Sequence, residues 1–238
     1  MRFFEVCRGG RFLFFGGWLF LFGGEEGLRS EVIPVPRILD SDTTWKAEHT
    51  YLLTGHTFVV TPPGAEKPTT LTIEPGTVVK ARFVEEPDKA EASALVITRG
   101  ARIRAEGTPE NPIILTSELD TPVGTLTEMD TRLWGGLVVL GRARINSRSD
   151  GKIRKPPIED EVEGFQVGPE EANFLKFGGE ADGDNSGIIR YVSIRHGGYP
   201  VSEGNEINGL TLAGVGSGTK VSHVEVFANK DDGFEFFG

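Results

Sequence analysis

The sequence predicts an all-β protein built as a parallel β-helix, on the basis of its composition, its short apolar runs and its internal repeats. Glycine contributes 32 residues and proline 14, more than a helical protein would carry. The apolar runs are short and rich in Val, Ile, Leu and Thr, which fit a pleated surface. With 238 residues, the chain is long enough for one large β domain with a sizeable core.

Residues 1 to 30 are set apart from the fold. Arg2, Arg8 and Arg11 precede the apolar run FLFFGGWLFLF, residues 12–22. This run is too short to span a bilayer comfortably and is typical of a signal-peptide core, although no small-residue cleavage site follows it. The alternative is an upstream stretch translated from a wrong start codon. We expect export through this atypical signal, an extracellular or cell-surface location, and no stable membrane span in the mature domain.

Internal repeats begin early in the domain that we expect from residue 31 to 238. LTIEPGTVVK resembles LVITRGARIR, with Leu71 of the first segment matching Leu95 of the second. GARIRA then recurs as RARINS, with Ala101 matching Ala143. Each copy contains a short apolar strand, a glycine corner and a second short strand.

Two further repeats occur near the C-terminal end. IRYVSI resembles VSHVEV, with Ile189 matching Val221, and GLVVLG resembles GLTLAG. Repetition at the length of a coil favours a parallel β-helix, in which each strand stacks on its equivalent one coil away. The alternative is an antiparallel β-sandwich, whose hairpin turns Asn208-Gly209 and Asp232-Gly233 could provide.

One long excursion and one abrupt end modify this pattern. A loop excursion is expected around residues 146–186, and its first part, residues 146–164, has mixed charges and prolines that predict a solvated segment. In the final stretch EVFANKDDGFEFFG, we expect Val224 and Val226 to face the core and residues 229–233 to form a corner. A solenoid needs capping at its ends, so the sequence predicts a domain that is truncated at its C-terminus.

The repeats resemble those of a set of exported bacterial β-helix proteins. The motifs that carry this resemblance are SDTTW, LTIEPGTVVK, ALVITRGARIRAEGTPENPIILTS, LWGGLVVLGRARIN, DNSGIIRYVSIRHGG, GNEINGLTLAGVGSGT and VFANKDDGFEFFG. The set consists largely of hypothetical lipoproteins and sorting-domain surface proteins of marine and gliding bacteria. The resemblance covers residues 40–238 and implies a right-handed parallel β-helix that is secreted or held on the cell surface. It implies no established activity.

Charge and cysteine content exclude several classes of partner and site. The chain has 35 acidic and 25 basic residues, a net charge of −10, which argues against nucleic acid and favours cations or neutral ligands. The one cysteine, Cys7, can form neither an intrachain disulfide nor a thiolate metal cluster.

Two acidic segments are candidate calcium sites. In EADGDNSGII, Asp182, Asp184 and Ser186 occupy the first, third and fifth positions of a calcium loop, but Ser193 stands where an EF-hand requires glutamate. The loop can still bind Ca²⁺ through its oxygen atoms. Asp231-Asp232 is the second candidate, with an ordinary turn as the alternative interpretation. Calcium is therefore the expected cofactor, with Asp182, Asp184, Asp231 and Asp232 as its ligands.

Four residues near the ends of strands are candidate catalytic residues. Arg195 and His196 follow a predicted strand, and Asp231 and Asp232 could act as a carboxylate pair if they sit in a bend. The alternative for His196 is a corner residue bonded to backbone carbonyls. A shared groove for these residues and the calcium candidates would indicate catalysis, whereas their dispersal over several corners would not.

Three aromatic residues at strand edges are candidate sugar-binding residues, because exposed rings stack on sugars. They are Trp45, Trp134 and Tyr199. If they are buried, they pack the coil ends or cover the excursion.

The main functional prediction is an exported or cell-surface binding or structural module that takes surface polysaccharide or another cell-envelope component as partner, stabilised by Ca²⁺. The first alternative is a polysaccharide lyase or glycoside hydrolase. The second is an adhesion module that self-assembles through its open coil ends.

Overall fold

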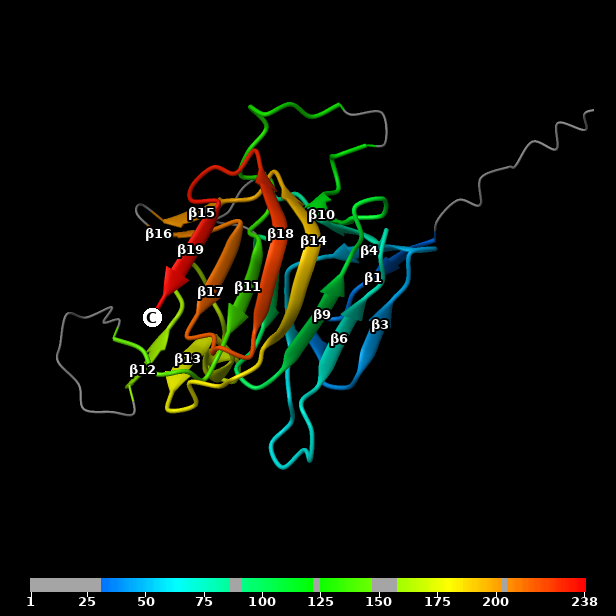
Figure 1. Ribbon diagram of the computed structural model, residues 1–238. Coiled ribbons are helices and arrows are strands. Elements are labelled where there is room, and N and C mark those ends of the chain that lie inside the picture. Colours follow the sequence, from blue (N-terminus) through cyan, green and yellow to red (C-terminus); the bar gives the residue numbers. More distant parts are fainter. Residues whose placement is uncertain (1–30, 86–90, 122–124, 147–157, 203–204) are drawn as a thin grey trace, which may run out of the picture.

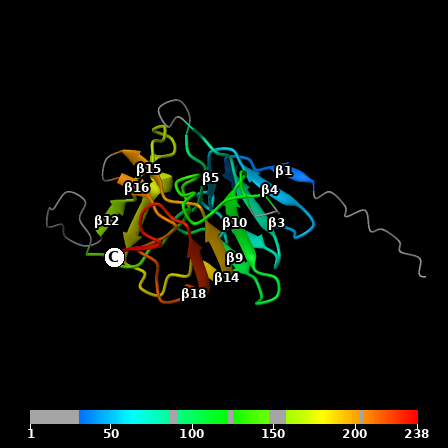
Figure 2. The same ribbon diagram turned by 90° about the horizontal axis from the view of Figure 1, so that it is seen from above.

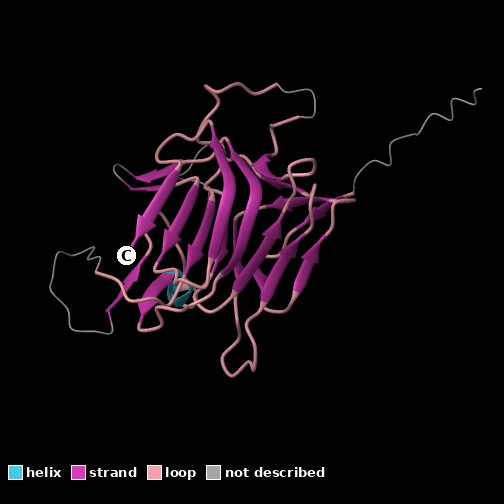
Figure 3. Ribbon diagram, in the orientation of Figure 1, coloured by secondary structure: helices cyan, strands magenta, loops and turns pink. Residues whose placement is uncertain are grey.

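The structure is a computed structural model in which strands predominate (Figure 3). It describes residues 31–85, 91–121, 125–146, 158–202 and 205–238. Most strands pair in parallel with a strand from the next coil, so the predicted all-β parallel β-helix is confirmed. The signal-like segment lies outside the described residues.

Each full coil passes in turn through three faces, which we call A, B and C. Faces A and B belong to one nine-stranded sheet, folded where β14 and β18 bend (Figure 1). Face A contains β3 (Thr43–Trp45), β6 (Thr70–Ile73), β9 (Arg102–Glu106), and the first halves of β14 (Gly187–Arg195) and β18 (Lys220–Phe227). Face B contains β1 (Val32–Pro34), β4 (Thr50–Leu53), β7 (Val78–Ala81), β10 (Ile113–Ser117), and the second halves of β14 and β18.

Face C is a separate six-stranded parallel sheet. Its strands are β2 (Ile38–Leu39), β5 (His56–Val59), β8 (Ala94–Ile97), β11 (Leu137–Leu140), β17 (Leu210–Ala213) and β19 (Phe234–Phe237). The interior between the three faces is filled by apolar side chains that point inward from each strand. Examples are Leu71 from face A, Leu115 from face B and Leu95 from face C, each at most 1% exposed.

The strand register confirms three of the predicted repeats. Leu95 pairs with Leu137, which is the offset that the match between GARIRA and RARINS predicts. Ile189 pairs with Val221, as the match between IRYVSI and VSHVEV predicts. The match between GLVVLG and GLTLAG is also correct, since Leu137 pairs with Leu210.

The predicted repeat that matches Leu71 with Leu95 is wrong. Leu71 lies on face A and pairs with Ile103, whereas Leu95 lies on face C. The two segments look alike because both contain a strand, a turn and a second strand, with a glycine in the left-handed region at the turn: φ is 83° at Gly76 and 91° at Gly100. The similarity therefore reflects shared corner chemistry rather than one full coil.

The corner between faces A and B is made differently in the last two coils. Tyr191 and His223 have φ values of 50° and 54°, so β14 and β18 turn at a single residue without leaving the sheet. Left-handed backbone is unfavourable for a residue with a Cβ, so the stacked packing of the two coils must hold it in place.

The described part of the excursion covers the outer surface of face C. It contains β12 (Ile158–Glu161), the 3-10 helix η1 (Ala172–Leu175) and β13 (Lys176–Gly179), and β12 and β13 form an antiparallel pair. Leu175 and Phe177 pack in one cluster with the outward side chains Phe58, Val96 and Val138 of face C. Residues 147–157 of the predicted solvated segment lie outside the described residues, whereas residues 158–177 form a packed cover.

A second antiparallel pair, β15 (Tyr199–Ser202) with β16 (Asn205–Ile207), lies between β14 and β17 along the chain. Both views show β12, β15 and β16 on the opposite side of the molecule from β1, β3 and β4 (Figures 1 and 2). These three strands therefore lie beside the later coils of the solenoid.

An ion network fastens the cover to the first coils. Arg37 donates to both oxygens of Glu171 in the cover, at 2.6 and 2.7 Å, and to both oxygens of Glu91, at 2.5 and 3.0 Å. Glu91 also accepts the backbone N–H of His56 at 2.9 Å, and the buried His56 ring has Nδ1 2.6 Å from Glu91 Oε1. Although burial raises the pKa of Glu91, hydrogen bonds from His56 and Arg37 lower it to about 2.

Candidate functional site

Face A has an outer surface of polar and charged side chains. The alternation of its strands places Leu71, Ile73 and Ile103 in the core and leaves every second residue outside. The central outward row runs across the coils through Thr44, Thr72, Arg104, Ile188 and Lys220. No cover comparable to residues 158–177 lies on this face within the described residues.

Four basic residues lie on this outer surface, three arginines and one lysine. They are Arg102, Arg104, Arg190 and Lys220. Arg104 and Arg190 are 66% and 47% exposed, and Lys220 is also exposed. The chain as a whole has a net charge of −10, so this concentration of positive charge stands out from the protein's average.

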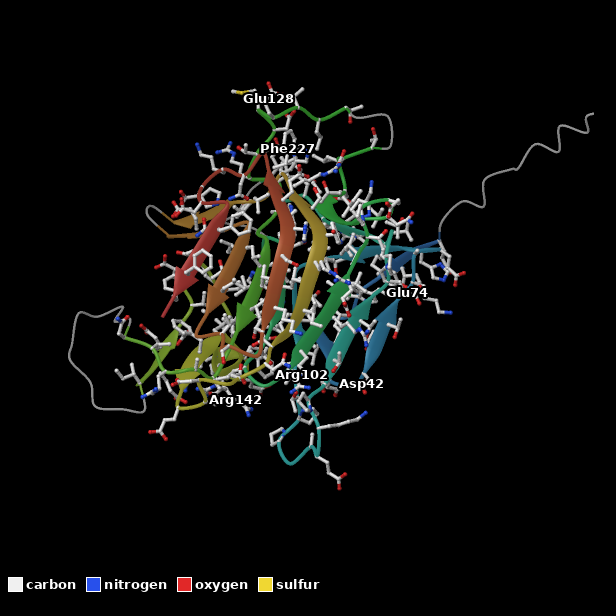
Figure 4. All side chains as sticks on the ribbon, in the orientation of Figure 1. Asp42, Glu74, Arg102, Glu128, Arg142 and Phe227 are labelled. Carbon is white, nitrogen blue, oxygen red and sulfur yellow. The ribbon has the colours of Figure 1, made fainter. Side chains whose placement is uncertain are left out.

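A depression of about 330 Å³ lies at the lower part of this surface. It is lined by Thr70, Arg102, Ile103, Arg104, Asn185, Gly187 and Ile188. Arg102 is held at its edge by a hydrogen bond of 3.0 Å from Nε to the backbone carbonyl of Asn185. Figure 4 shows Arg102 at the end of face A, on the same side as Asp42.

Glycine is required at one position under the depression. Gly187 has a φ of 117°, and a Cβ there would lie 1.8 Å from the backbone oxygen of Ile103. A side chain at this position would push β9 and β14 apart. The close approach of the two strands therefore depends on Gly187.

Aromatic rings border the same surface at the bend between faces A and B. Tyr191 stacks on His223 of the next coil, with ring centroids 4.4 Å apart and an interplanar angle of 23°. The Arg190 guanidinium lies 6.0 Å from the Tyr191 ring centroid. An elongated polar ligand on face A would therefore meet cationic groups, threonine hydroxyls and an aromatic edge.

This combination of groups is suited to an anionic polymer. Guanidinium groups bind carboxylate and sulfate through paired hydrogen bonds, and aromatic rings offer surfaces to sugar rings. Because the basic residues come from β9, β14 and β18, they span neighbouring coils rather than converging on one point. The surface fits an extended ligand better than a small molecule.

Comparison with models of known protein families assigns the chain to a family. Residues 37–238 match the family model described as the pectate-lyase-like β-helix domain. The chain belongs to this family. Comparisons with curated proteins and with solved structures gave no match. The match therefore assigns the fold and the family of this pectate-lyase-like β-helix protein. It assigns no ligand or reaction to the chain.

The aspartates of the calcium-loop candidate are engaged in bonds within this pectate-lyase-like β-helix. The carboxylate of Asp182 accepts from Arg144, whose Nε lies 3.0 and 2.9 Å from its two oxygens, and the Arg144 hydrogen bonds lower the Asp182 pKa. Asp184 accepts the hydroxyl of Ser186 at 3.2 Å. The backbone carbonyls of Asp182 and Asp184 accept N–H groups of residues 217 and 218 in the next coil. The loop thus stacks one coil on another.

The other aspartate pair lies at a different corner. Asp231 and Asp232 are exposed in the turn between β18 and β19, as the corner interpretation predicts. The backbone carbonyl of Asp232 accepts the Nδ2 of Asn229 at 2.7 Å and the N–H of Gly209 at 3.1 Å. The four predicted calcium ligands are therefore split between two corners.

No group of three or more His, Cys, Asp or Glu side chains that could hold a metal ion occurs in the residues that the structure describes. Calcium binding stays a prediction. Likewise, no helix in the described ranges is long and apolar enough to cross a membrane.

The candidate catalytic residues Arg195 and His196 reach the same corner as Asp231 and Asp232, but their side chains are occupied elsewhere. Arg195 Nε donates to Ser193 Oγ at 2.9 Å. His196 is 3% exposed, and its Nδ1 lies 2.6 Å from the backbone oxygen of Asp130. The backbones of these four residues therefore meet at one corner in adjacent coils, but their side chains do not line a shared groove.

The three candidate sugar-binding aromatics are buried. Trp45 is 2% exposed and stacks on Tyr51, with ring centroids 5.0 Å apart. Trp134 is 1% exposed, and its Nε1 donates to the backbone oxygen of Arg195 at 2.7 Å. Tyr199 is 6% exposed. Their environment corresponds to the packing alternative, because a ring must be exposed to stack on a sugar.

Sequence reasoning missed the basic residues of face A. The segment RIRAE already shows arginines alternating with core residues, which indicates that both arginines share the outer side of one strand. Arg190 and Lys220 could not be assigned to the same outer surface without knowing how the strands pair, because the long excursion separates β9 from β14 along the chain.

Proposed function

We propose that the protein is an exported or cell-surface glycan-binding module that holds an anionic polysaccharide on face A. The observation that supports this proposal is the set of four basic side chains on one uncovered sheet of an acidic chain. The proposal includes export of the protein and kinship with lipoproteins and sorting-domain surface proteins. It also includes a cell-envelope polymer as the partner.

The physical argument is that binding requires a surface both accessible and chemically suited to the ligand. Face C is not accessible, because residues 158–177 cover its outward apolar side chains. Face A presents hydroxyl and guanidinium groups from the strands of one continuous sheet, so the strand register fixes the spacing of their backbones. A polyanion that contacts several coils would gain several weak interactions at once.

The test measures binding of the full chain to three polymers: polygalacturonate, dextran sulfate and neutral dextran. We expect binding of the two anionic polymers, weakened by added salt, and none of neutral dextran. Arg102→Ala should lower the affinity about tenfold, in line with a lost charge-assisted hydrogen bond. Lys46→Ala removes the same charge from an exposed position, where Lys46 is 58% exposed, and should change little.

Two results would contradict the proposal: equal binding of neutral dextran, or equal affinities for the wild-type chain and Arg102→Ala. Either would show that the basic surface of face A does not select the ligand.

Hydrolysis or lyase cleavage of a polysaccharide at the β19 end of face C, apart from the polymer bound on face A, is a second candidate function, favoured by one residue. Glu235 is half-buried on β19, and its pKa is raised by burial and by the carboxylates of Glu163 and Asp232. Hydrogen bonds from Asn208 and Thr211 offset only part of this increase. A raised pKa favours the protonated form of a carboxyl group, which is the form that acts as a general acid. The same mixtures are therefore assayed for new chain ends, whose absence would leave binding alone.

Self-assembly through the coil ends stays a prediction. Phe234 and Phe236 on β19 are 42% and 71% exposed, and they stand in register with the inward residues Leu210 and Leu212.

A further inference from the structure

The carboxylate of Glu106 lies between two arginines of face A. Arg104 Nε donates to Glu106 Oε1 at 2.8 Å, and Arg190 Nη2 donates to Glu106 Oε2 at 3.3 Å. Glu106 and Arg104 belong to β9, and the register places Glu106 directly beside Arg190 of β14. The carboxylate is 24% exposed, less than either guanidinium.

This arrangement resembles a filled anion site. Each oxygen of one carboxylate accepts from a different guanidinium, as the carboxylate of a uronic acid or two oxygens of a sulfate group would. The groups that would bind a ligand's anion are thus already occupied by an anion of the protein.

The neighbouring residues keep the two arginines at this position. Arg190 lies near the Tyr191 ring, which stacks in turn on His223. Arg104 lies in the central outward row beside Thr72 and Ile188. When a ligand's anion displaces the Glu106 carboxylate, the guanidinium groups remain on the same face.

We propose that Glu106 is an internal competitor that sets the specificity of face A, an inference that rests on the proposed function. Glu106 occupies the position between Arg104 and Arg190 in the free protein, and the anionic group of the ligand replaces it on binding. A ligand with isolated charges gains little from this exchange. A densely charged polymer also engages Arg102 and Lys220, and so overcomes the competition.

The decisive substitution is Glu106→Gln, which is nearly isosteric and removes the competing charge. We expect the affinity for dextran sulfate and polygalacturonate to rise about three- to fivefold, because exposed ion pairs of this kind are weak and readily displaced. The matched control is Glu110→Gln, which removes an equal charge from an exposed position in the neighbouring loop. Only the rise beyond that of the control is attributed to competition.

The direction of the change decides between two roles. If Glu106 instead positions the arginines for the ligand, Glu106→Gln will weaken binding, and the inference is overturned. A rise no larger than that of Glu110→Gln also overturns it.

A second measurement is independent of polymer binding. Phenylglyoxal modifies accessible guanidinium groups, and peptide mass analysis gives the rate at Arg104 and Arg190 separately. We expect about a twofold or larger increase at both in Glu106→Gln, with no change in Glu110→Gln. If the wild-type chain binds no polyanion, the proposed function fails, whatever the modification rates are. If the modification rates at Arg104 and Arg190 are the same in Glu106→Gln and the wild-type chain, the inference that Glu106 masks these arginines is overturned.

Discussion

Faces A and C present similar side chains to the core but opposite ones to the outside. Inward, both contribute aliphatic residues such as Ile103 and Ile97. Outward, face A presents threonine and arginine, whereas face C presents Phe58, Val96 and Val138, each 0% exposed beneath the cover. The coil backbone is therefore common to both faces, and the outward residues decide whether a face binds a ligand or packs against the chain's own excursion.

The strand sequences already contain this difference. On face A, TLTI alternates between outward and buried residues. On face C, ALVI and LVVL are apolar at every position and buried at every position. A strand buried on both sides is expected to be continuously apolar, and a strand with one open side to alternate. The two patterns thus distinguish the open face from the covered one.

The largest expected effect comes from removing the packing between face C and its cover. Phe58 is fully buried, and its ring centroid lies 5.4 Å from that of Phe174 in the cover. Phe58→Ala should reduce the free energy of unfolding by about 3–4 kcal/mol, because the substitution loses buried apolar surface and leaves a cavity. Urea unfolding measures the loss.

The matched substitution on the open face is Thr72→Ala, at an outward position of β6. It should change the free energy of unfolding by no more than about 0.5 kcal/mol. Equal losses in Phe58→Ala and Thr72→Ala would show that the cover contributes no packing and would remove the contrast between the faces.

The next effect concerns the ion network that fastens the cover. The folded-state pKa of Glu91, about 2, lies below its ordinary value of 4.5, so the stability that Glu91 contributes is present above pH 4.5 and is lost as the pH falls toward 2. Glu91→Gln should cost about 2 kcal/mol at pH 7, because it weakens the bonds to Arg37 and the buried His56.

The measurement is thermal unfolding of both chains at a series of pH values from 7 to 2. The difference in stability should shrink as the wild-type carboxylate becomes protonated. A difference that stays constant over this range would mean that the Glu91 charge does not contribute to fastening the cover.

The fold was predictable because it depends on local patterns repeated along the chain. Short strands with inward Leu, Ile and Val, separated by glycine corners and repeated at the length of a coil, indicate a solenoid, and the repeat from Ile189 to Val221 even predicted the register. The corner at Asp231 and Asp232 was predictable for the same reason, since Asp-Asp-Gly favours a turn wherever it occurs.

The candidate site was not predictable, because its contacts join residues that no local pattern connects. Glu106 bonds to Arg190, 84 positions further along the chain, and Asp182 bonds to Arg144 across a corner. The oxygen-rich loop at Asp182 has residue types that serve both coil stacking and calcium binding, so the sequence could predict calcium without showing the stacking bonds. Only the register shows which oxygens are already bonded.

The smallest expected effect tests the edge of face C, where Glu235 is an outward charge in a row that continues through Thr211 to the apolar Val138 and Val96. Its pKa is raised by burial and by Glu163 and Asp232, so the folded protein holds this proton more tightly than the unfolded chain does. Stability therefore falls as the pH rises above the ordinary value of 4.5, and the charged carboxylate is unfavourable at pH 7. Glu235→Gln should stabilise the protein by about 0.5 kcal/mol at pH 7.

The gain should disappear at pH 4, where the wild-type carboxyl is protonated and as neutral as the glutamine. Urea unfolding at the two pH values measures it, with Glu128→Gln, an exposed loop position, as the control for net charge. An equal gain at both pH values would indicate a packing effect instead of charge repulsion. A gain confined to pH 7 would show that face C excludes charge up to its last strand, whereas face A carries charge on its central strands.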